Sequence, residues 1–183
     1  MSGLKEFIIP FIGLKDESHE FGFEVNDTFF EAFPGSEIQK GSVKVRAEML
    51  KRPQMLTFDV FLDGEVSLPC DRCGNNYRQP VNGSFQLIVN LNGETFNDED
   101  DLISLPPGAH EFDLSQYLYE YLTLLLPSRK VCGETPDPSR GDCDPVILEK
   151  LKELEPGHSE EATGDDENSD PRWEGLKNIK FDN

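Results

Sequence analysis

The sequence predicts an α+β fold, in which an antiparallel β-sheet or open barrel is packed by one main helix. The first half of the chain contains apolar and aromatic runs that alternate with polar residues, as half-buried strands do. A single leucine-rich segment with helical periodicity follows these runs. The 183 residues are 36% hydrophobic and include 13 Phe, which is enough apolar material for one modest core.

The first elements are short. Two runs, EFIIPFI (6–12) and EFGFEV (20–25), flank a KDES turn and are expected to be β-structure. The segment NDTFFEAF (26–33) predicts a short helix that Thr28 caps, with Glu31 completing a capping box three residues later.

Longer strands follow. SVKVRAEML (42–50) alternates, so that its buried face is expected to consist of Val43, Val45, Ala47 and Met49. LTFDVFLDGEVSL (56–68) carries Asp63-Gly64, which predicts a hairpin turn between two strands. Another strand, SFQLIVNL (84–91), is expected to close at Asn92-Gly93, and an acidic loop covers 94–101.

The best helix candidate is DLSQYLYEYLTLLLP (113–127). Asp113 and Gln116 predict a capping box, and Pro127 predicts the end of the helix. Its apolar stripe is expected to pack against the sheet, although a partner groove is the alternative. The stripe consists of Leu114, Tyr117, Leu118, Tyr121, Leu122 and Leu125.

The C-terminal part of the chain differs from the rest in composition and in the structure that it predicts. Asp144 and Pro145 are expected to start a second helix, and a single α+β domain is expected to span 1–152. Residues 153–169 are acidic and lack Lys and Arg, which is typical of a flexible linker. The last segment, 170–183, predicts a short helix that either docks on the domain or recognises a partner.

The formal charge of −19 limits the partners. So negative a chain repels a phosphate backbone at long range and attracts Lys/Arg-rich proteins, although acidity also serves solubility alone. No secretory signal and no apolar run of about 18 residues is seen, so we expect a soluble, intracellular protein without membrane contact. In a reducing compartment, its four cysteines are expected to be thiols or metal ligands.

The cysteines form the most specific chemical pattern. Cys70 and Cys73 are two residues apart in the stretch LPCDRCGNNY, a spacing that lets both sulfur atoms face one ion. With Cys132 and Cys143 they form a candidate site for one structural Zn²⁺. The alternatives are free thiols without an ion, and redox chemistry. Redox chemistry is disfavoured because this CxxC joins two strands, whereas thioredoxin-type motifs begin a helix.

Other catalytic patterns are absent from the sequence. It contains no Walker loop, GxGxxG, HExxH or GxSxG. We therefore expect a protein that is not an enzyme and has no small-molecule substrate.

These motifs, in this order, resemble the YceD family, the bacterial and plastid proteins linked to accumulation of large-subunit ribosomal RNA. The resemblance runs from about residue 5 to residue 181. Its matching positions are Cys70, Arg72, Cys73 and Gly74 in the turn; Asp113, Leu114, Glu120, Leu122, Leu124, Leu126 and Pro127 in the helix; and Asp170, Pro171, Arg172 and Leu176 near the end.

The resemblance implies a cytoplasmic, bacterial ribosome-biogenesis factor that supports 23S rRNA accumulation and large-subunit assembly. The expected partners are basic ribosomal proteins or assembly factors, or rRNA itself. The alternative function is zinc handling or CxxC thiol oxidoreduction. Candidate partner- or RNA-binding residues are Arg46, Arg52, Arg72 and Arg78, with Lys51 nearby, and Asp170, Pro171, Arg172, Trp173 and Leu176 in the terminal segment.

Overall fold

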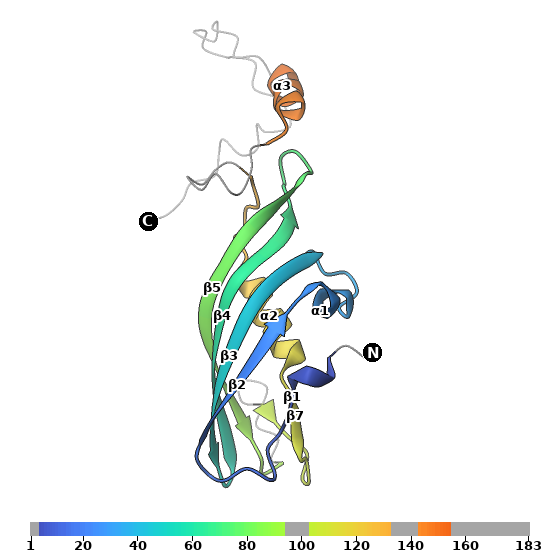
Figure 1. The fold of residues 1–183 in the computed structure, drawn as a ribbon. Coiled ribbons are helices and arrows are strands. Elements are labelled where there is room, and N and C mark those ends of the chain that lie inside the picture. The colour runs from blue at the N-terminus through green and yellow to red at the C-terminus, as the bar shows by residue number, and fades with distance from the viewer. Residues whose placement is uncertain (1–3, 94–102, 133–142, 155–183) are drawn as a thin grey trace, which may run out of the picture. The chain divides into compact units, whose positions relative to one another are not determined.

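The principal element is a five-stranded sheet with the strand order β2-β3-β4-β5-β6 (Figure 1). The computed structural model describes residues 4–93, 103–132 and 143–154. Neighbouring strands are antiparallel except β5 and β6, which are parallel. The strands are β2 (Ser18–Val25), β3 (Lys40–Arg52), β4 (Met55–Pro69), β5 (Asn76–Asn90) and β6 (Ile103–Ser104).

The remaining elements are shorter. A two-stranded ladder pairs β1 (Ile8–Pro10) with β7 (Glu111–Asp113). The helices are the 3₁₀ turn η1 (Lys5–Phe7), α1 (Asp27–Glu31), α2 (Ser115–Leu124) and α3 (Pro145–Leu154). Across the described residues, no helix has the length and apolarity needed to cross a membrane.

The chain divides into two compact units, Met1–Leu148 and Glu149–Asn183. The first contains the sheets, α1, α2 and all four cysteines. Helix α3 starts where Asp144 and Pro145 predict, since the Asp144 carboxylate accepts a hydrogen bond from the Val146 N–H at 2.9 Å. The predicted acidic loop 94–101, most of the predicted linker and the segment 170–183 lie outside the described residues.

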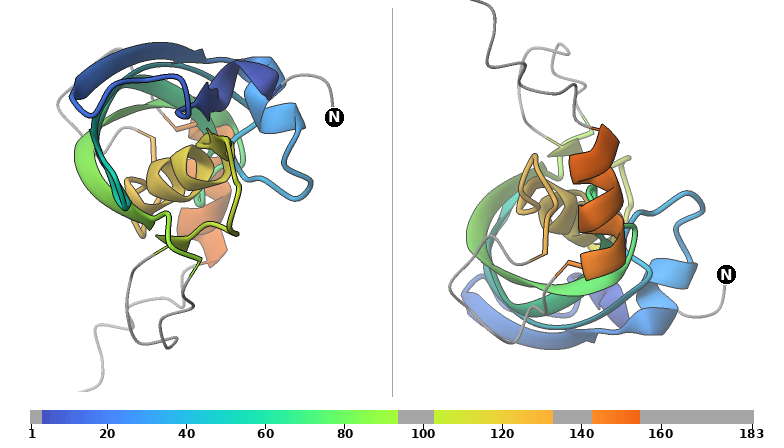
Figure 2. Two further views of the ribbon diagram at one scale, coloured as in Figure 1. Left: turned by 90° about the horizontal axis from the view of Figure 1, so that it is seen from below. Right: turned by 90° about the horizontal axis from the view of Figure 1, so that it is seen from above.

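The core lies between the sheet and α2, around which the strands curl (Figure 2). The alternation in β3 is confirmed, because its four predicted inward residues are all buried: Val43, Val45, Ala47 and Met49. The fold is therefore α+β with open, mainly antiparallel sheets, as predicted.

Helix α2 packs on the sheet through its leucine stripe, as predicted. Leu118 and Leu122 are fully buried, and Tyr121 stacks on Phe85 of β5 with ring centroids 4.4 Å apart. Asp113 lies one residue before the N-cap Leu114, and its carboxylate accepts a hydrogen bond from the N–H of Ser115, the first residue of the helix, at 2.9 Å. Its predicted partner in a capping box behaves differently, because the Gln116 amide donates to Glu120 one turn further on.

The cap of α1 also differs from the prediction. The side chain of Asn26, rather than Thr28, caps this helix and accepts a hydrogen bond from the Thr28 N–H at 3.1 Å. Asn is at least as good an N-cap as Thr, and the sequence offers both within three residues.

The predicted hairpin at Asp63-Gly64 is wrong. Strand β4 runs through both residues, with Asp63 opposite Lys44 and Gly64 opposite Val43. Gly64 has no positive φ. Instead, a Cβ at this position would lie 2.2 Å from the carbonyl oxygen of Ser42, so the glycine permits close approach of β3. The sequence alone does not distinguish a glycine that allows two strands to pack closely from one that forms a turn.

Replacing Gly64 by Ala is expected to force β3 and β4 apart and to lower the free energy of unfolding by about 1–3 kcal/mol. The matched control is Gly22→Ala on β2, where an added Cβ meets nothing within 4 Å. We expect this control to be neutral or slightly stabilising. Urea unfolding of both variants makes the comparison, and equal stabilities would contradict the close-approach explanation.

Candidate metal centre

The four cysteines converge, with all their sulfur atoms within 4.8 Å of one another. Cys132 is central, with its Sγ 3.4 Å from Cys70, 3.6 Å from Cys73 and 2.9 Å from Cys143. Cys70 and Cys143 are 3.8 Å apart. Cys70, Cys132 and Cys143 are buried, whereas Cys73 is half-buried. The predicted site residues are therefore brought together from three places in the chain.

The first cysteine pair sits in a turn between β4 and β5. The Gly74 N–H donates to the Cys70 carbonyl oxygen, and the Cys70 N–H donates to the Asn75 carbonyl oxygen, each at 2.9 Å. Gly74 has a φ of +76°, which only glycine adopts without strain. This tight reversal aims the Arg72 N–H at the Cys70 sulfur, at 3.4 Å.

The second pair comes from the loop that follows α2 and from the residue preceding the α3 cap. The Cys132 N–H points at the Cys70 sulfur from 3.5 Å, so backbone groups of both loops face one thiol. Sulfur atoms bound to Zn²⁺ at about 2.3 Å in a tetrahedron lie about 3.8 Å from one another. Three of the four distances between sulfur atoms given above lie within about 0.4 Å of that value. Four thiol sulfur atoms form a soft donor set, which suits Zn²⁺ or iron.

The ionisation of these thiols is uneven. Burial opposes ionisation of Cys70, but the N–H groups of Cys132, Cys73 and Arg72 outweigh it and lower its pKa to about 6. Burial, together with hydrogen bonding to the neighbouring cysteines, raises the pKa of Cys132. Several thiolates this close repel one another unless a cation lies between them, so the chemistry of the cluster fits a metal ion.

The geometry does not match a thioredoxin-type redox motif. That chemistry places the first cysteine at a helix N-terminus with access to solvent. Here both cysteines of the CxxC lie in a turn between strands, and Cys70 is only 3% exposed.

A polar tether joins the two cysteine loops. The Asp71 N–H donates to the Lys130 carbonyl oxygen at 2.6 Å, and the Lys130 N–H donates to the Asp71 carboxylate at 2.8 Å. The Lys130 ammonium also pairs with Glu37 at 2.5 Å, and this hydrogen bond is the main cause of its raised pKa. The sequence gives no signal for this tether beyond the position of Asp71 between two cysteines.

Removing the Asp71 carboxylate with Asp71→Ala is expected to loosen the second loop, because it leaves the Lys130 N–H without this acceptor. We expect a loss of about 1 kcal/mol in urea unfolding and faster reaction of Cys132 with a thiol reagent. Asp63→Ala is the matched control, since Asp63 also accepts a side-chain hydrogen bond, from Asn82 on the sheet surface. Equal thiol reactivity in the two variants would exclude the tether.

The predicted basic residues do not form one cluster. Arg46 lies on β3, pairs with Glu48 and stacks over the Phe61 ring at 4.1 Å. Arg52 ends β3, whereas Arg78 is in register with the first residue of that strand. The two positions are therefore twelve residues, or about 40 Å, apart along the strand. Arg72 belongs to the cysteine turn. Their role in binding remains a prediction, as does that of Asp170, Pro171, Arg172, Trp173 and Leu176, which lie outside the described residues.

Lys51 is likewise engaged, through an ion pair with Asp16 at 2.8 Å.

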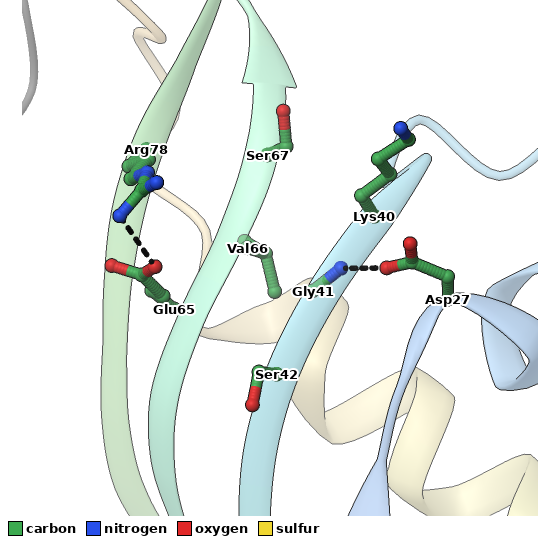
Figure 3. A pocket seen from close by; sticks show the side chains of 8 residues that line it. All are labelled: Asp27, Lys40, Gly41, Ser42, Glu65, Val66, Ser67 and Arg78. Carbon is green, nitrogen blue, oxygen red and sulfur yellow. Dashed lines mark hydrogen bonds and ion pairs between the residues drawn. The ribbon is translucent and has the colours of Figure 1, made fainter.

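Arg78 lines a hollow of about 330 Å³ at the end of the sheet (Figure 3). Lys40, Ser67 and Arg78 are directly opposite one another on three neighbouring strands. Two carboxylates balance the two cations, since Glu65 pairs with Arg78 at 3.2 Å and Asp27 also lines the hollow. The balance of charge gives this hollow no preference for an anion.

These features define a class: an α+β domain in which a cluster of four cysteines joins the end of the sheet to the loop after the main helix. Residues 58–180 match the sequence model described as "Large ribosomal RNA subunit accumulation protein YceD". The chain therefore belongs to the YceD family, as its motifs suggest. The match begins in β4 and covers β5, α2 and all four cysteines. Searches of curated proteins and of solved structures gave no significant match.

Proposed function

We propose that this protein is a non-enzymatic factor that supports 23S rRNA accumulation and large-subunit assembly by binding basic ribosomal proteins or assembly factors. The family match carries the proposal, because it covers most of β4, all of β5, the main helix and the cysteine cluster together. This role places its work in the bacterial cytoplasm, beside immature large subunits. It involves no small-molecule substrate.

The arrangement of charges supports a basic partner. Carboxylates outnumber cations by 36 to 17. Several of the cations are already engaged, in the pairs Arg46–Glu48, Lys51–Asp16, Arg78–Glu65 and Lys130–Glu37. The resulting negative field attracts polycations and repels bare rRNA. Direct rRNA contact through Arg46, Arg52, Arg72 and Arg78 is the alternative route.

We further propose that Cys70, Cys73, Cys132 and Cys143 hold one structural Zn²⁺. Four thiolates leave no open coordination position, as expected of a structural rather than a catalytic site. The ion would fix the end of the β4–β5 hairpin to the loop after α2.

Co-purification from cells tests the function. Tagged protein is expected to enrich immature large-subunit particles and basic ribosomal proteins, with retention that falls steeply between low and high salt. Depletion is expected to lower 23S rRNA relative to 16S rRNA. An unchanged rRNA ratio together with no enrichment would remove the proposal.

A Cys70→Ser, Cys73→Ser double variant separates this role from thiol oxidoreduction. If the double variant keeps 23S rRNA at normal levels while a disulfide-exchange activity of the wild-type protein disappears, the oxidoreductase alternative holds instead.

A further inference from the structure

A largely apolar hollow of about 550 Å³ lies beside the N-terminus of α2. Its apolar wall consists of Leu4, Ile8, Ala32, Phe33 and Pro34. We call this hollow the α2 pocket. Its volume lies within the range typical of ligand-binding pockets, and its lining combines apolar surface with a few polar groups.

The wall of the α2 pocket is held in place by stacked rings. Phe33 stacks on Tyr119 of α2, with centroids 4.2 Å apart and planes 6° from parallel. Phe33 also contacts Phe29, a buried residue of α1, at 5.1 Å. Rings packed on both elements keep the pocket preformed, so that an incoming side chain need not open it.

Four carboxylates line the pocket or belong to residues that adjoin or bond its lining. Asp113 lines the pocket, and Glu120 accepts a hydrogen bond at 2.8 Å from Gln116, another lining residue. Glu6 and Glu31 are exposed and directly adjoin the lining residues Lys5 and Ala32. On the described elements η1, β1, α1, β7 and α2, Lys5 is the only cation.

We propose that the α2 pocket binds an apolar side chain of a Lys/Arg-rich protein segment, whose flanking cations pair with Glu6, Glu31, Asp113 and Glu120. This inference deepens the proposed function and rests on it, because it assigns a surface to the basic partner. The apolar wall selects the anchor side chain. These four carboxylates, which we call the rim, select the basic residues that flank the anchor. A segment that has only basic side chains pairs with the rim but leaves the pocket empty.

Two synthetic peptides test this assignment on the full-length protein. Both are rich in Lys and Arg, and they differ only in a central Leu or Ser. The Leu peptide is expected to bind about tenfold more tightly in isothermal titration calorimetry, from burial of its side chain. Ala32→Trp fills the pocket and should remove the difference while leaving the affinity for the Ser peptide unchanged.

The rim is tested by a charge-matched pair of variants. Glu6→Gln, Glu31→Gln, Glu120→Gln should weaken binding of both peptides about three- to tenfold at low salt. Glu20→Gln, Glu24→Gln, Asp63→Asn changes the charge equally on the outer face of the sheet and should have a clearly smaller effect. Equal effects would show that only the overall field matters, and would overturn the rim.

A third test uses only the wild-type protein and so does not depend on whether a variant folds. Titration with the Leu peptide should shift the methyl signal of Ile8, in the pocket, and leave that of Ile88, on the outer face of the sheet, unchanged. Equal binding of both peptides, with Ile8 unperturbed, would overturn the pocket. Co-purification with immature large subunits would in that case still support the proposed function, whereas its failure would remove the function itself.

Discussion

Purified protein is expected to contain one zinc per chain, and Cys132→Ser is expected to lose it. Cys132 is the most consequential of the four positions, because its sulfur lies within 3.6 Å of all three others. Its loss leaves three thiolates, which hold the ion less tightly and repel one another once it leaves. Elemental analysis and titration of free thiols measure the two quantities directly.

The effect on stability should be large. Structural zinc contributes its binding free energy to folding, so metal-free protein is expected to melt roughly 10 °C or more below the zinc-loaded form. A chelator should lower the melting temperature of the wild-type protein and have no further effect on Cys132→Ser. Four freely titrating thiols and no bound metal in the wild-type protein would eliminate the centre. Iron at the same stoichiometry would keep the centre and change the identity of its ion.

Leu118→Ala in α2 is expected to cost about 3 kcal/mol of unfolding free energy, which lowers the melting temperature by roughly 6–12 °C. Leu118 is 0% exposed, and it is part of the stripe by which α2 packs on the sheet. Truncation removes that contact and leaves a cavity in the core.

Leu124→Ala is the matched control on the same helix. Leu124 is 72% exposed, so the same change of atoms should alter stability by no more than about 0.5 kcal/mol. Urea unfolding with an unchanged m-value compares the two variants. A similar cost at both positions would mean that α2 is not anchored through the Leu118 side of its surface.

Most of the fold could be predicted from short-range patterns in the sequence. The alternation of Val43, Val45, Ala47 and Met49 predicts the buried face of β3, because side chains of a strand point alternately to opposite faces. Asp113 predicts the start of α2 for an equally local reason, since its carboxylate reaches an N–H two residues away. The error at Asp63-Gly64 shows the limit, because whether a glycine turns or packs depends on its neighbours across the sheet.

The candidate centre shows the same division. The CxxC spacing and Gly74 indicate a metal-binding turn from the sequence, since both sulfur atoms and the left-handed residue belong to one short loop. That Cys132 meets this turn is decided by the packing of α2 on the sheet and by the pairing of Asp71 with Lys130, and Cys143 joins them from the residue before the α3 cap.

The sequence by itself determined the class of fold, the family and the CxxC pair of the candidate metal centre, because each depends on residue types and on spacings of a few residues. Only the tertiary structure decided which loops meet, why Gly64 is a glycine and where an apolar hollow lies beside α2. Those features depend on residues far apart in the chain, whose separation in space is set by the packing of the whole core.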